Sequence, residues 1–123
     1  MTSRRILIVD DEPLIAALLE DWLLELGYQV AGPACSVADA LAILAGGGID
    51  GAILDVTLGR ETSYPVAEEL RRLAVPFVFA TGHSADHLEP EFQDAVTLAK
   101  PFDFADVQRA LALFPSRDFP SVT

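Results

Sequence analysis

Five short apolar runs, rich in β-branched and aromatic residues, alternate along the chain with longer stretches of helical periodicity. The runs are RRILIV, YQVAG, GAIL, FVFA and VTLA, at residues 4–9, 28–32, 51–54, 77–80 and 96–99. Strands that alternate with helices indicate βαβ units and a parallel sheet. With right-handed crossovers, five such strands most simply take the order 2-1-3-4-5. The pattern therefore predicts an α/β fold: a doubly wound, five-stranded parallel sheet with helices on both faces.

Helices are predicted between these runs. The first begins near Pro13 and ends at Gly27, since proline favours the first turn and glycine the end. Its apolar residues at helical spacing are expected to face the core, and they are Leu14, Leu18, Trp22 and Leu26. Ser36 followed by Asp39 resembles a cap for a second helix that ends at the glycines of 46–48. The third and last helices are expected over 65–73 and 103–114, the last with an apolar face of Phe104, Val107, Leu111 and Phe114.

The remaining helix, between Gly82 and Ala95, is expected to be short, broken or mobile. Pro90 lies inside it, and a proline within a helix costs about 3 kcal/mol unless a new turn begins there.

Length and charge limit the classes of function. The 123 residues fit one domain, expected over 1–115, followed by a short tail at 116–123 and no output domain. The net charge of −11, without a cluster of lysine or arginine, argues against nucleic-acid binding. No apolar run is long enough for a membrane span and no leader pattern is present, so we expect a cytoplasmic protein without a membrane partner. Cys35 is the only cysteine, which excludes an internal disulfide.

Polar side chains follow four of the five runs. Asp10 and Asp11 come after the first, Asp55 after the third, Thr81 after the fourth and Lys100 after the fifth. Parallel strands present their carboxyl ends at one edge of a sheet, where ligands bind in this class of fold. Two carboxylates about 4 Å apart oppose each other by roughly 4 kcal/mol at an effective dielectric near 20. Oxygen ligands without histidine or cysteine suit Mg²⁺, which would offset that repulsion.

This set of groups is arranged for phosphoryl transfer. An ionised Asp55 needs no general base to act as a nucleophile. Mg²⁺, Lys100 and the hydroxyl of Thr81 can meet negative charge on the transferring oxygens.

The residues resemble the receiver domain of two-component response regulators over essentially the whole chain. The family's acidic pair matches Asp10 and Asp11, its phosphoaccepting aspartate matches Asp55 in ILDVTLG, its hydroxyl residue matches Thr81 in FATGH, and its lysine matches Lys100 in AKPF. The resemblance implies a flavodoxin-like fold and a phosphorylation switch that accepts a phosphoryl group from a histidine kinase on Asp55. It also implies that Asp11, Asp55 and the backbone carbonyl of Thr57 bind Mg²⁺, with Asp10 acting through water. A cis peptide bond before Pro101 is implied as well.

Two departures from ordinary receivers point to a subfamily. Ordinary receivers usually carry a proline and a glycine in the loop after the phosphoacceptor, whereas here the loop reads TLGRETSYPVAEEL. Thr97 occupies the position of the usual aromatic switch residue. With FATG at residues 79–82 they make the chain similar to the stand-alone FAT GUY receivers associated with HWE-type histidine kinases. That motif continues with aromatic residues, whereas this chain has His83 and Ser84.

Two other classes of protein are alternatives to a receiver. A haloacid-dehalogenase-like phosphatase also uses an aspartate with Mg²⁺, but it needs a second acid two residues later, where this chain has Thr57. Its nucleophile also lies on the first strand of its fold. We therefore expect a phosphoacceptor and not an enzyme that turns over. A flavin-binding module of the same fold would place its phosphate against an acidic rim.

Two hypotheses concern regulation. His83 is two residues after Thr81, where it could tune dephosphorylation; zinc binding by His83 and His87 is discounted for want of a third ligand. From Pro90 and Thr97 we expect phosphorylation to order the fourth segment and reshape its surface with strand 5 and the last helix. Phosphate relay, phosphate sink and binding of a downstream protein or phosphotransfer protein all remain open.

Overall fold

A parallel sheet of five strands forms the centre of the molecule in the computed structural model, which describes residues 4–82 and 88–114. The strand order is β2-β1-β3-β6-β7, and every neighbouring pair is parallel. This confirms the predicted order, with β6 and β7 as the fourth and fifth strands. The strands are β1 (Arg5–Val9), β2 (Gln29–Ala34), β3 (Gly51–Asp55), β6 (Phe77–Thr81) and β7 (Thr97–Ala99).

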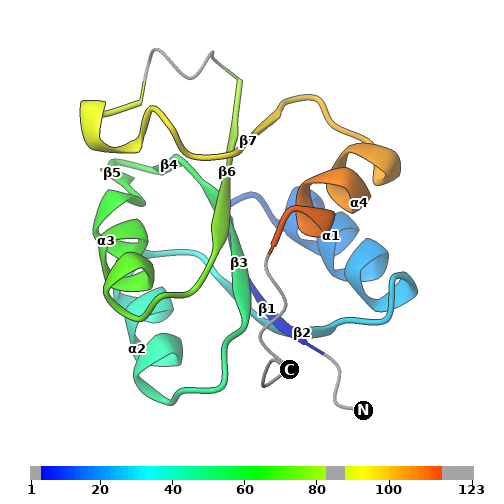
Figure 1. The fold of residues 1–123 in the computed structure, drawn as a ribbon, viewed down its shortest axis with the longest axis horizontal. Coiled ribbons are helices and arrows are strands. Elements are labelled where there is room, and N and C mark those ends of the chain that lie inside the picture. Colours follow the sequence, from blue (N-terminus) through cyan, green and yellow to red (C-terminus); the bar gives the residue numbers. More distant parts are fainter. Residues whose placement is uncertain (1–3, 83–87, 115–123) are drawn as a thin grey trace, which may run out of the picture.

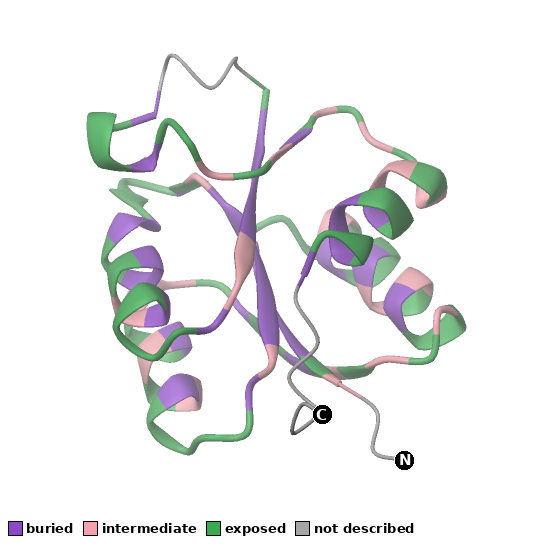
Figure 2. Ribbon diagram, in the orientation of Figure 1, coloured by how far each residue is buried: buried purple, intermediate pink, exposed green. Residues whose placement is uncertain are grey.

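Four α-helices in the described part of the chain cover the two faces of the sheet. Figure 1 shows α1 (Pro13–Glu25) and α4 (Phe104–Ala112) on one side, and α2 (Val37–Ala45) and α3 (Tyr64–Arg72) on the other. Alternate side chains of a strand point to opposite faces, and the core divides accordingly. On β1, Ile6 and Ile8 pack with α1 and α4, while Leu7 and Val9 pack with α2 and α3. Figure 2 shows the buried residues concentrated in the strands and on the inner sides of the helices.

The predicted core face of the first helix is correct for Trp22 and Leu26, which pack against the core, and wrong for Leu14 and Leu18. Leu14 is 85% exposed and Leu18 40%, whereas the buried residues of this helix are Ala16, Leu19 and Leu23. Trp22 is partly buried against the second core cluster, as expected of a packing residue. Apolar residues lie on most sides of this helix, so their helical spacing is compatible with more than one core face.

Helix caps agree closely with the sequence. The hydroxyl of Ser36 accepts a hydrogen bond from the Asp39 amide at 3.1 Å and begins α2. Asp103 and Asp106 exchange backbone-to-side-chain hydrogen bonds at the start of α4, the arrangement of a capping box. On α4, Val107 and Leu111 are buried on the predicted apolar face. The third helix begins at Tyr64, one residue before its predicted start.

Strand β2 continues beyond its predicted end. It passes through Gly32 and Pro33, which are joined by a cis peptide bond, and stops at Ala34. Gly32 has a φ of +90°, and a Cβ built there would lie 2.8 Å from the Ala34 nitrogen and 2.9 Å from the Ile8 oxygen. Only glycine fits this close approach of two backbones.

The segment after β6 contains no α-helix within its described part. Between Leu88 and Ala95 the chain forms a single 3-10 turn, η2 (Pro90–Phe92), which begins at the proline. The prediction of a short or broken element is therefore confirmed for Leu88–Ala95, and the rest of that segment, 83–87, lies outside the described residues. No helix in the described ranges is long and apolar enough to cross a membrane.

Candidate functional site

Three carboxylates meet at one edge of the sheet, as the sequence predicts. Asp10 directly follows β1 and Asp55 ends β3, and the two strands are neighbours with Val9 opposite Leu54. With Asp11 they offer oxygen atoms that all lie within 4.8 Å of one another.

Asp10 is a buried carboxylate with only part of its hydrogen bonding satisfied. It is 3% exposed, and its Oδ1 accepts a hydrogen bond from the Glu12 amide at 2.9 Å. Its Oδ2 is buried without a partner among the described residues. Burial raises the pKa of Asp10 to about 6; the Glu12 amide opposes this rise and the charge of Asp55 adds to it. When Asp10 is ionised, its Oδ2 therefore has no stabilising group among the described residues, and the site could still accommodate one.

Burial and a neighbouring cation shift the pKa of Asp55 in opposite directions. Asp55 is 8% exposed, and burial raises its pKa, whereas Lys100 lowers it. The Nζ of Lys100 lies 3.3 Å from Asp55 Oδ1 and 3.8 Å from Glu12 Oε1. The lysine thus stands between two carboxylates, one buried and one exposed.

Thr81 and Lys100 come from the two strands beyond Asp55. Ala80 pairs with Asp55 across β3 and β6, and the Lys100 amide donates to the Thr81 carbonyl at 2.9 Å. Thr81 is buried, and it lines the same cavity as Asp55 and Thr57, which encloses about 360 Å³. The peptide bond between Lys100 and Pro101 is cis, as predicted. All five sequence-predicted side chains therefore reach one edge of the sheet.

A small hairpin beside this edge was missed by the sequence reasoning. Strands β4 (Thr57–Leu58) and β5 (Glu61–Thr62) pair antiparallel around Gly59 and Arg60. Gly59 has a φ of +63°, which suits the first position of a two-residue hairpin loop. A Cβ at Gly59 would lie 3.8 Å from Asp11 Oδ2, so the turn runs past the acidic cluster. The amide of Thr57 hydrogen-bonds to the Asp55 carboxylate and lowers its pKa.

Other wall residues of the cavity also escaped the sequence reasoning: Val56, Thr62, Tyr64, Gly82 and Leu88. The local sequence carries no signal for Tyr64 or Leu88, because both reach the cavity through contacts between segments that are distant in the sequence. His83, proposed above to tune dephosphorylation, lies outside the described residues, as does His87, which was considered with it for zinc binding and discounted.

Comparison with known families decides the assignment. The model of the response regulator receiver domain matches residues 6–112, which include all of the acidic, hydroxyl and lysine positions above. The chain belongs to the response regulator receiver family.

Relatives of this receiver include proteins of about the same length and longer proteins of which the match covers only a part. It is 34% identical over 119 residues to the transcriptional regulatory protein PdtaR of Mycobacterium tuberculosis; the match covers 93% of this chain and 58% of PdtaR. The chain thus spans little more than half of that relative. It is 52% identical to SdrG from Sphingomonas melonis Fr1, covering 91% of this chain and 97% of SdrG, with a TM-score of 0.81. The response regulator TrrA from Thermotoga maritima, solved with Mg²⁺ and BeF, is 29% identical, covering 91% and 99%, with a TM-score of 0.79.

These relatives bear on the finer resemblance and on the alternatives. The similarity to SdrG supports the resemblance to the FAT GUY receivers. The phosphatase alternative is unsupported, because the matched family is the receiver and Asp55 ends the third strand of the chain.

The donor set of this receiver fits Mg²⁺. Three carboxylates supply hard oxygen ligands within a small volume. The buried Oδ2 of Asp10, which has no partner in the described part of the chain, gives an independent reason to expect a cation or its bound water beside it.

Proposed function

We propose that this receiver is a phosphorylation-dependent switch in which Asp55 accepts a phosphoryl group from a histidine kinase. The observation that carries the proposal is the position of Lys100, 3.3 Å from a buried Asp55 that shares its edge of the sheet with Asp10 and Asp11. A buried nucleophile between an acidic cluster and a cation can accept a dianionic phosphoryl group only where positive charge is supplied.

The reaction is a transfer between two nucleophiles. An oxygen of Asp55 forms a bond to phosphorus while the bond from phosphorus to the imidazole nitrogen of the donor histidine breaks. The electron pair of the broken bond stays on the imidazole, and the product is an acyl phosphate. Lys100 follows the developing charge from the carboxylate to the phosphoryl oxygens, and Thr81 can donate its hydroxyl proton to one of them. The group stays on Asp55, so we expect stoichiometric transfer and slow hydrolysis instead of turnover.

Asp11, Asp55 and the backbone carbonyl of Thr57 are the proposed Mg²⁺ ligands, with Asp10 acting through water. When bound, Mg²⁺ would offset the repulsion among the carboxylates and the incoming phosphoryl oxygens. TrrA, which has been solved with Mg²⁺ and BeF, supports this assignment by similarity.

A histidine kinase is the proposed donor. TrrA has been solved in complex with the histidine kinase ThkA, which supports a kinase of that general class for this receiver. The resemblance to FAT GUY receivers favours an HWE-type kinase. Relay, sink and protein-binding roles remain open for the product.

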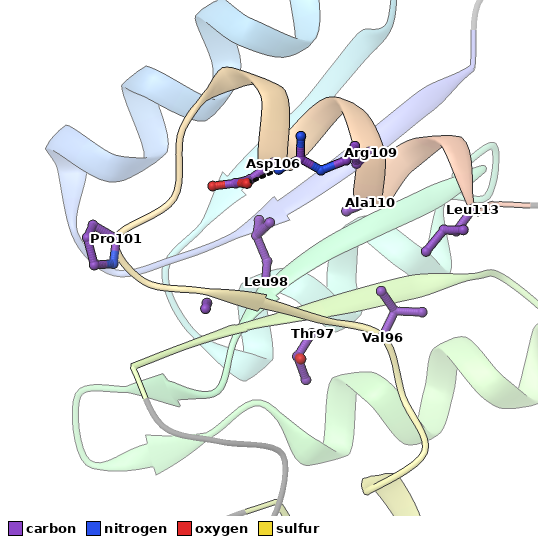
Figure 3. Close-up of a pocket in the computed structure, with 9 residues that line it drawn as sticks. Val96, Thr97, Leu98, Pro101, Asp106, Arg109, Ala110 and Leu113 are labelled. Atoms are coloured by element: carbon purple, nitrogen blue, oxygen red, sulfur yellow. Dashed lines mark hydrogen bonds and ion pairs between the residues drawn. The ribbon is translucent and has the colours of Figure 1, made fainter.

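The proposed output surface includes a groove between β7 and α4. Figure 3 shows it between the strand and the helix, with Pro101 near one end and Leu113 near the other; its volume is about 300 Å³. Leu113 is 65% exposed there. Thr97 and Leu98 project to opposite sides of the strand. Phosphorylation is proposed to act on this surface through the segment Leu88–Ala95, which leads into β7.

Intact-mass analysis tests the proposed function. We expect wild-type protein incubated with Mg²⁺ and a small phosphodonor to gain the mass of one phosphoryl group, and Asp55→Asn to gain none. Asp21→Asn, an exposed change on α1, is the matched control and should behave as wild type. Equal labelling of Asp55→Asn and wild type would refute the assignment.

A further inference from the structure

Tyr64 joins the phosphoacceptor cavity to the segment after β6. Its side chain is buried at the start of α3 and lines the cavity of about 360 Å³ that also holds Asp55 and Thr81. Leu88, the first described residue after the gap at 83–87, lines the same cavity. One aromatic side chain thus lines the same cavity as the proposed phosphorylation site and the first described residue of the following segment.

The ring of Tyr64 is fixed by two other buried rings. It stacks on Phe92 with centroids 5.3 Å apart and planes 5° apart, and it meets Phe79 edge-on at 5.8 Å and 75°. Phe92 belongs to η2, and Phe79 to the centre of β6. Movement of Tyr64 would therefore disturb the packing of η2 against the sheet, because close-packed side chains cannot shift independently.

The hydroxyl of Tyr64 holds the backbone of the same segment. Its oxygen accepts a hydrogen bond from the Glu89 amide at 3.1 Å, one residue before η2 begins. Farther along α3, Arg71 donates to the Glu91 carbonyl at 2.7 Å and places its guanidinium 4.5 Å from the centre of the Phe92 ring. The segment is thus attached to α3 at two points, of which only Tyr64 lines the cavity beside Asp55.

Tyr64 can still donate a hydrogen bond. A tyrosine hydroxyl accepts and also donates, and no described residue accepts a hydrogen bond from the Tyr64 hydroxyl. A phosphoryl group on Asp55 would bring strong acceptor oxygens into the cavity that Tyr64 lines. A hydroxyl that donates to such an oxygen becomes a better acceptor, since linked hydrogen bonds polarise one another.

We propose that Tyr64 is a positioning residue that donates its hydroxyl proton to the phosphoryl group on Asp55 and thereby tightens its hold on the Glu89 amide. This inference depends on the proposed function. Phosphorylation then orders the segment Leu88–Ala95 through α3. The connection runs through the Tyr64 ring, which packs on Phe79 of β6, whereas Thr97, paired with Phe79 on β7, has no ring.

Amide hydrogen exchange at Glu89 tests this role, with Mg²⁺ and BeF₃⁻ as the probe. In wild type we expect the probe to slow exchange at Glu89 by about tenfold. This is the fold-change that corresponds to the free energy of one added hydrogen bond, here the bond from Tyr64 to the probe. Tyr64→Phe keeps the ring and removes the hydroxyl, so its Glu89 amide should exchange faster without the probe and respond less than about twofold to it. Tyr28→Phe changes the other tyrosine, away from the cavity, and should respond as wild type.

Resonances of Asp55 and Thr81, followed in the same samples, report binding of the probe itself. If these respond in Tyr64→Phe while the effect at Glu89 is lost, the inference holds. If Glu89 is slowed equally in Tyr64→Phe and wild type, or is unchanged in wild type that binds the probe, the inference is overturned. A wild type whose Asp55 and Thr81 resonances do not respond overturns the proposed function, and the inference with it.

Discussion

Replacing Asp10 by asparagine is expected to stabilise the metal-free protein at neutral pH. Asp10 is a buried carboxylate whose Oδ2 has no partner among the described residues, and burial raises its pKa from 3.8 to about 6. A raised pKa means that folding favours the protonated acid. The fold is therefore free of this penalty below about pH 4, and the penalty grows as the pH rises through 6.

The magnitude follows from the same values. One pKa unit corresponds to about 1.4 kcal/mol, so the rise from 3.8 to about 6 corresponds to a penalty of about 3 kcal/mol above pH 7. Asparagine removes the charge at almost constant shape, but its amide protons also need acceptors. We therefore expect Asp10→Asn to gain about 1–3 kcal/mol in unfolding free energy.

Urea unfolding with a chelator present measures this gain. At about pH 7.5 the full difference between Asp10→Asn and wild type should appear, and at about pH 5 roughly half of it should remain. Added Mg²⁺ should stabilise wild type by mass action and Asp10→Asn less. Asp21→Asn, exposed on α1, should show neither effect. A variant no more stable than wild type at about pH 7.5, or a gain that persists unchanged in acid, would refute the reasoning.

Three further predictions concern charge, backbone fit and capping. Lys100→Met should slow phosphorylation of Asp55 by a small donor about 100-fold, because it removes the cation beside that carboxylate; a rate within twofold of wild type would contradict this. In urea unfolding, Gly32→Ala should cost at least about 2 kcal/mol more than Gly27→Ala, since both have positive φ but only Gly32 faces backbone at 2.8 Å; equal costs would count against it. Asp103→Ala should lower the unfolding free energy by about 1 kcal/mol through loss of the α4 cap, with Asp103→Asn nearly neutral, and an unchanged urea midpoint in Asp103→Ala would rule this out.

The sheet and the principal site residues could be predicted from the sequence because both depend on short-range patterns. Strands buried on both faces give continuous apolar runs, and the residue that follows each run must lie at the carboxyl edge of the sheet. Asp10, Asp55, Thr81 and Lys100 were placed in this way, and the structure brings them together.

The features that escaped prediction depend on contacts between distant segments. The core face of α1 is selected by the sheet beneath it, because Leu14 and Leu19 are equally apolar and only the packing distinguishes them. The hairpin around Gly59 has strands of two residues, too short for an alternating pattern. Tyr64 enters the cavity only because that hairpin turns the chain beside Asp55.

Lys100 already lies beside Asp55 in the unphosphorylated protein, where it can bind the phosphoryl group after transfer. Its ammonium is shared between buried Asp55 at 3.3 Å and exposed Glu12 at 3.8 Å. A shift from the carboxylate to a phosphoryl oxygen on the same residue requires little movement of the lysine.

Site mapping of the acyl phosphate tests the central claim most directly. Protein treated with a phosphodonor and Mg²⁺ is reduced with borohydride, which converts a phosphoaspartate to a stable alcohol, and is then digested and sequenced by mass spectrometry. The account predicts conversion at Asp55 alone, and none when a chelator replaces Mg²⁺. Conversion at Asp10 or Asp11, or equal conversion at Asp55 without divalent ions, would contradict it.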